Sequence, residues 1–165
     1  GATGDIAENV ISGGAEPVQV SRETFAPPVP CPPLQMKTNS HLIREFVRGK
    51  DGDRDGLIYQ ALVEDSAVSC SQEADGQRRL KLGFTGDVTP GPAWRGGDVV
   101  LPLRVTIPAS SDADQKPLVS EVIQIPVSIE AGGRGQQWTY VDEKFVIPMN
   151  QGSKIQFGFE EGRRR

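Results

Sequence analysis

Two stretches decide the fold: Val99-Val-Leu-Pro-Leu-Arg-Val-Thr-Ile107 and Ile123-Gln-Ile-Pro-Val-Ser-Ile129. In both, every odd-numbered position is apolar, and most of the even-numbered positions between them are polar or proline. A period of two places alternate side chains on opposite faces of a β-strand. Because the loop from 108 to 117 is polar, the two strands are predicted to form a hairpin with one buried face.

The remainder of the chain has further strand-like segments and no convincing helical period. Turn signals rich in glycine, aspartate and proline separate these segments, and a Gly/Pro-rich loop is predicted from Gly86 to Gly97. The other predicted strands are 42–47, 57–63 with a continuation toward 70, 80–84, 138–149 and 155–159. About seven antiparallel strands at this spacing predict an all-β, immunoglobulin-like β-sandwich, with a barrel as the alternative.

Three predicted strands contain an internal proline. Pro102, Pro126 and Pro148 donate no backbone hydrogen bond, so their strands are expected at sheet edges or at bulges. Such prolines protect an edge against unwanted pairing, which is the favoured interpretation. An edge kept open for a partner strand is the other.

Composition separates the chain into two parts. Residues 1–35 carry six of the 13 prolines between positions 17 and 33, which predicts a flexible Pro/Gly-rich tether. Residues 36–161 are assigned to one β-sandwich domain. The net charge of −4 argues against nucleic-acid binding, and no apolar run is long enough to span a bilayer. The start at Gly1, without methionine, is interpreted as a processed or trimmed N-terminus.

The two cysteines, Cys31 and Cys70, leave three interpretations open. A disulfide is favoured, two buried thiols are the second interpretation, and a metal site is the third. Zinc is disfavoured because the chain has one histidine and no C-x-x-C spacing. A disulfide would indicate an oxidising compartment.

An aspartate-rich turn resembles the first half of a calcium loop. Asp51, Asp53 and Asp55 are spaced so that oxygens two residues apart can converge on one cation. The twelfth position is Leu62, where such a loop needs a bidentate glutamate. A polar hairpin turn is therefore favoured over a calcium site, and no other cofactor is expected.

No catalytic constellation is evident. His41 is the only histidine, and no G-x-S-x-G elbow occurs, so the protein is not expected to be an enzyme. In the Gly/Pro-rich loop, Trp94 either covers one end of the sandwich or anchors a partner. Together with Arg95 it is the candidate partner-binding pair, because tryptophan and arginine are enriched at binding hot spots.

Several short patches resemble a family of uncharacterised alphaproteobacterial envelope lipoproteins. They are Cys31-Pro32-Pro33, Tyr59-Gln60-Ala61 followed by Cys70, Gly91-Pro92, Leu101-Pro102-Leu103-Arg104-Val105, Ile125-Pro126-Val127, Val141-Asp142-Glu143 and Gly158-Phe159-Glu160. The resemblance implies export, a two-cysteine β domain and a lipidated N-terminal cysteine, although Gly1 stands where that cysteine belongs.

The expectation is therefore a non-enzymatic binding or scaffolding protein of the cell envelope. It is expected in the periplasm, anchored to the outer membrane through an N-terminal lipid that this chain does not contain, with an envelope protein as partner. The alternative is a calcium-dependent adhesion or carbohydrate-binding module.

Overall fold

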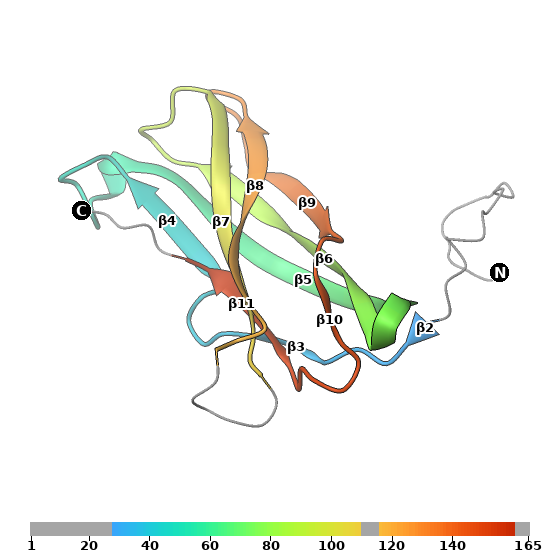
Figure 1. Cartoon of the computed structure of the whole chain (residues 1–165). Helices are drawn as coiled ribbons and strands as arrows, with labels where there is room; N and C mark the ends of the chain where they lie inside the picture. Colours follow the sequence, from blue (N-terminus) through green and yellow to red (C-terminus); the bar gives the residue numbers. More distant parts are fainter. Residues whose placement is uncertain (1–27, 110–115, 161–165) are drawn as a thin grey trace, which may run out of the picture.

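The computed structural model describes residues 28–109 and 116–160, which form two packed β-sheets (Figure 1). The large sheet has the order β10-β6-β5-β2, with β4 also pairing with β5 and β9 with β6. Its strands are β2 (Pro28–Val29), β4 (Leu42–Phe46), β5 (Leu57–Glu73), β6 (Gln77–Pro90), β9 (Gln136–Asp142) and β10 (Val146–Pro148).

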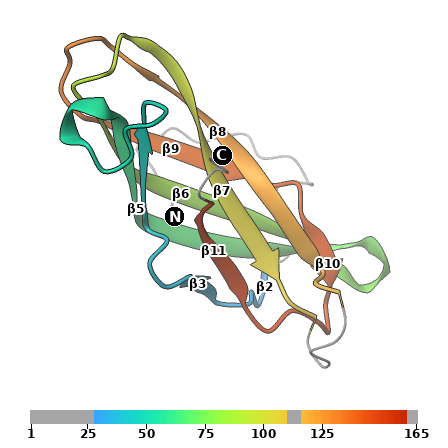
Figure 2. The same cartoon turned by 90° about the vertical axis from the view of Figure 1, so that its left-hand side faces the viewer.

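The small sheet has the order β3-β11-β7-β8. Its strands are β3 (Leu34–Met36), β7 (Gly97–Ile107), β8 (Val119–Ile129) and β11 (Ile155–Phe159). All pairings are antiparallel except that of β3 with β11. Figure 2 shows the β7–β8 hairpin crossing over β5 and β6. The prediction of an all-β, mostly antiparallel sandwich is confirmed. The only helical segments among the described residues are two short 3-10 turns, η2 (Arg54–Gly56) and η3 (Ala74–Gly76).

The core lies between the sheets and follows the predicted alternation. The odd-numbered apolar residues of β7 and β8 are buried, except for the half-buried Val99 and Val119 near the strand ends, and alternate residues of β5 and β6 are buried as well. Phe84 and Phe157 meet across the sheets with ring centroids 5.1 Å apart, and Trp138 lies 6.2 Å from Phe159. The hairpin that organises the sequence therefore supplies one wall of the core.

The long strands extend beyond their predicted limits. Strand β5 runs on to Glu73 because a bulge between Val63 and Asp65 lets it change register and continue. Strand β6 runs through Gly86 to Pro90, so the prediction that a loop starts at Gly86 is wrong. A Cβ atom at Gly86 would lie 1.8 Å from the Leu62 carbonyl oxygen, so this glycine permits close packing within the sheet.

The predicted strand over 138–149 is in fact two strands. Strand β9 starts earlier, at Gln136, and ends at Asp142. There an Asp142 carboxylate oxygen accepts a 3.0 Å hydrogen bond from the Lys144 backbone N–H, which turns the chain before β10 begins. The first predicted strand ends at Phe46 instead of residue 47, at a bulge against β5.

Two of the three proline-bearing strands lie at edges, as predicted, and one does not. Strands β8 and β10, which carry Pro126 and Pro148, are edge strands. Strand β7 lies between β11 and β8, so the edge prediction for Pro102 is wrong. The Pro102 carbonyl accepts a 2.9 Å hydrogen bond from the Glu160 N–H, directly beyond the last residue of β11. Pro102 thus lies at the end of the hydrogen-bond ladder between β7 and β11, where its missing N–H does not interrupt the pairing.

The predicted boundary between tether and domain falls inside the sheets. Strands β2 and β3 lie within the segment 1–35 or cross its end, and they pair with β5 and β11. The described fold therefore begins by Pro28 rather than at Met36. Residues 1–27, which hold the remainder of the predicted tether, lie outside the described residues.

Candidate functional site

The disulfide is the best-defined of the predicted sites. Cys31 and Cys70 are bonded, and their Cα atoms are 5.5 Å apart, so the favoured interpretation is confirmed. Next to the bridge, Val29 of β2 pairs with Cys70 of β5. The covalent bond thus fixes the first described residues to the longest strand of the large sheet.

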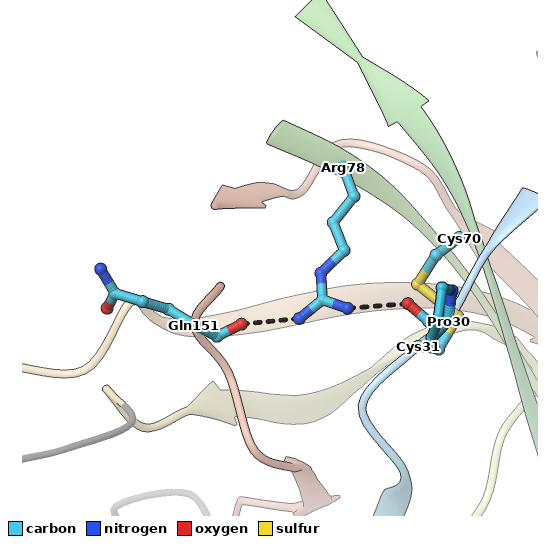
Figure 3. The surroundings of a disulfide bond; sticks show 5 residues. All are labelled: Pro30, Cys31, Cys70, Arg78 and Gln151. Atoms are coloured by element: carbon cyan, nitrogen blue, oxygen red, sulfur yellow. Dashed lines mark hydrogen bonds between the residues drawn. A yellow bond between two sulfur atoms is a disulfide. The ribbon is translucent and has the colours of Figure 1, made fainter. Parts of the chain in front are cut away.

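An arginine completes this junction (Figure 3). The guanidinium of Arg78 donates to the Pro30 carbonyl at 2.7 Å and to the Gln151 carbonyl at 2.6 Å. Arg78 is only 7% exposed, and among the described residues its Nε has no hydrogen-bond partner. Burial lowers the pKa of this guanidinium. It ties the segment beside the disulfide to the loop between β10 and β11.

Trp94 and Arg95 lie in the loop between β6 and β7 and differ in their surroundings. The loop is attached to the start of β5, because the Ala93 N–H donates to the Leu57 carbonyl at 2.9 Å. Trp94 is half-buried against the core, and its indole Nε1 donates to the Ile129 carbonyl at 2.9 Å. These contacts are those of a residue that covers the end of the sandwich. Arg95 is exposed, and the partner-binding role of the pair stays a prediction.

The three aspartates of the β4–β5 turn do not form a cluster. Asp51, Asp53 and Asp55 are exposed, and Asp53 Oδ1 accepts a 3.1 Å hydrogen bond from the Asp55 N–H, which caps the turn η2. Within residues 28–109 and 116–160, no three His, Cys, Asp or Glu side chains are arranged to hold a metal ion. The local geometry agrees with the polar turn favoured from the sequence, and it adds nothing to the calcium hypothesis.

A pair of carboxyl groups lies on the outer face of the large sheet. Glu64, at the bulge of β5, lies next to the carboxyl group of Asp87 on β6. Hydrogen bonding with Asp87 raises the pKa of Glu64, and desolvation and the charge of Asp87 act in the same direction. Sequence reasoning missed the pair because the bulge decides which side chains share this face.

The same face carries a shallow trough. It consists of two adjoining hollows of about 170 and 210 Å³ that share Ala67 and Gly83. In the register, Gly83 lies between Ala67 of β5 and Val141 of β9, and a Cβ atom at Gly83 would meet open space. Ala67 and Gly83, which are small and lie side by side on two neighbouring strands, leave the space that forms the trough. Gly83 in an alternating strand was the available signal, but its neighbours are known only from the pairing.

Lys144 links the edges of the two sheets. Its Nζ lies 3.0 Å from the buried carboxylate of Asp142 and 3.8 Å from Glu121 of β8. The hydrogen bond to Asp142, followed by the charges around it, raises the pKa of Lys144. The ammonium group also lies 5.0 Å from the centroid of the Phe145 ring. This arrangement compensates the charge of Asp142 at the rim of the core.

Comparisons with protein-family models, with curated proteins and with solved structures found no match to this chain. Within the described residues, no helix is long and apolar enough to cross a membrane.

Proposed function

We propose that the protein is a non-enzymatic binding or scaffolding protein of the bacterial cell envelope. In this proposal it resides in the periplasm, is held at the outer membrane by an N-terminal lipid anchor, and takes an envelope protein as its partner. Its assignment to the immunoglobulin-like class of sandwiches, and its resemblance to the alphaproteobacterial lipoproteins, belong to the same proposal.

The observation that carries the proposal is the junction around Cys31. The β2–β5 pairing, the disulfide to Cys70 and the Arg78 bond to Pro30 all hold the chain where the N-terminal segment meets the sheets. A force applied to the N-terminal segment is transmitted to β5 through the Cys31–Cys70 disulfide. Such an attachment suits a domain held by its N-terminus, and a disulfide suits an oxidising compartment.

The end of the sandwich around Trp94 supports a binding role. The loop is fixed at Leu57 and Ile129, so it offers a preorganised surface with Arg95 exposed beside the half-buried indole. Binding to a rigid surface loses less conformational entropy than binding to a flexible loop. Tryptophan and arginine are among the residue types most enriched at binding hot spots.

The test is capture of the partner from cells. The full-length protein with its own leader is expressed with a C-terminal tag, crosslinked in intact cells, and purified from the envelope fraction. We expect recovery in that fraction with a crosslinked partner, and we expect Arg95→Glu to reduce the crosslinked product at least fivefold.

Lys116→Glu is the matched control. It makes the same charge reversal on an exposed residue at the opposite end of the β7–β8 hairpin, as the register Gly97↔Ile129 and Ile107↔Val119 places it. An equal loss of crosslinked product in both variants would show that Arg95 is not part of the binding surface. Recovery of the protein in the cytosolic fraction alone would overturn the proposed function.

A further inference from the structure

Strand β8 has a long open side. It is 11 residues long and lies at the edge of the small sheet, paired with β7 in one unbroken register from Gly97↔Ile129 to Ile107↔Val119. In the described part of the chain, no strand pairs with its other side. The other edge strands are shorter: β4 has five residues, β9 has seven and β3 has three.

The backbone groups on this open side follow from the ladder. The Pro102 carbonyl bonds to the Glu160 N–H, so the even-numbered residues of β7 direct their backbone groups toward β11. The odd-numbered residues of β7 therefore face β8, and in β8 the even-numbered residues face away from β7. The Ser128 carbonyl accepts a 2.7 Å hydrogen bond from Gln136 Nε2, which agrees with an outward direction for the backbone groups of the even-numbered residues.

Ser120, Val122 and Gln124 consequently present N–H and C=O groups outward along the edge. Pro126 has no N–H, which ends the run of donors on one side. The stretch from Ser120 to Gln124 contains no bulge and no proline, which are two of the devices that normally protect an edge strand.

The charged side chains next to this run have oppositely charged neighbours within the chain. The side chain of Glu121 lies on the opposite sheet face from those of Ser120 and Val122, and its carboxylate is 3.8 Å from Lys144 Nζ. Arg104, opposite Val122 in the register, is paired with Glu160 and donates to the Ser120 hydroxyl at 2.9 Å. Ser120, Val122 and Gln124 are themselves neutral, so no like charges face each other among these residues when two copies of the edge meet.

We propose that two copies of this chain pair antiparallel through β8, about a two-fold axis at Val122. Val122 then faces Val122 of the second copy, and Ser120 faces Gln124 of the second copy on each side of the axis. Each of these three pairs exchanges two backbone hydrogen bonds, and Pro126 lies outside the paired run. The polar–apolar–polar order of the outward residues is the same read in either direction, which favours a second copy over an unrelated strand.

The decisive variant is Val122→Cys in the otherwise complete chain. Residues directly opposite in a hydrogen-bonded antiparallel pair have Cα atoms about 5.5 Å apart, which lies within the range for a disulfide. On mild oxidation we expect most of the protein to form a crosslinked dimer on non-reducing gels. Val100→Cys, at a half-exposed position on the same sheet face but one strand inward, should stay monomeric under the same conditions.

Light scattering after gel filtration supplies the second measurement. The wild-type chain should have about twice its 17.8 kDa mass at high micromolar concentration. Val122→Lys should halve that mass without changing the melting temperature by more than a few degrees, and Val100→Lys should leave it unchanged. A monomeric wild type, a Val122→Lys variant that stays dimeric, or crosslinking of both cysteine variants would each overturn the proposal.

Discussion

Replacing Cys31 and Cys70 together by alanine is expected to lower the free energy of unfolding by about 4 kcal/mol. The two residues are separated by 39 positions, so the bridge closes a loop of about 40 residues. In the chain-entropy treatment, closing a loop of this length removes about 13 cal/mol/K from the unfolded chain, or about 4 kcal/mol at 25 °C. Loss of the buried Cys70 sulfur from the core adds up to about 1 kcal/mol.

Urea unfolding followed by tryptophan fluorescence measures this difference. The midpoint should fall, and the slope against urea should rise because an unbridged unfolded chain exposes more surface. Reducing agent should move the curve of the wild type to within about 1 kcal/mol of the curve of the double variant, because the reduced protein keeps the buried Cys70 sulfur, and it should leave the variant where it is. A loss below about 1 kcal/mol, with both proteins folded, would refute the argument from loop closure.

Three further predictions concern side chains in the sheets and at the end of the sandwich. Gly86→Ala should cost more than about 2 kcal/mol in the same assay because its Cβ meets the Leu62 carbonyl, whereas Gly83→Ala should stay within about 0.5 kcal/mol. Trp94→Ala should cost about 2 kcal/mol, and a loss below about 0.5 kcal/mol would show that the ring does not cover the core. Burial raises the pKa of Tyr59 to about 12, so stability should fall from about pH 10 to 12; a Tyr59→Phe variant with an equally steep alkaline loss would contradict this.

The sequence predicts the parts of the fold that depend on local alternation. The odd-numbered positions 101–107 of β7 and 123–129 of β8 are apolar because they face one core, so their period is visible without any knowledge of partners. Strand lengths were predicted less well. Gly86 reads as the start of a loop in isolation, and only the approach of the Leu62 carbonyl explains why a strand needs it. The break after Asp142 depends on a side-chain bond that no periodicity reveals.

The candidate sites show the same division. The partners of the disulfide were predictable because two cysteines allow only one intramolecular pairing, whereas the sequence left two buried thiols and a metal site open as alternatives. The role of Arg78 was not, because it sits at a core-facing position of β6 and is held there by carbonyls from residues 30 and 151. From the sequence alone, Arg78 only breaks the apolar alternation of its strand. The reason for its burial is visible once the carbonyl groups that accept its hydrogen bonds are located. The open side of β8 likewise follows from sheet order, which local sequence does not determine.

The redox state of the cysteines in living cells tests the central claim most directly. Cells expressing the full-length protein are quenched in acid, fractionated, and treated with a maleimide of high mass that adds to free thiols. The account predicts that the protein is found in the envelope fraction with neither Cys31 nor Cys70 modified until it is reduced. Cytosolic protein in which both cysteines react without prior reduction would contradict it.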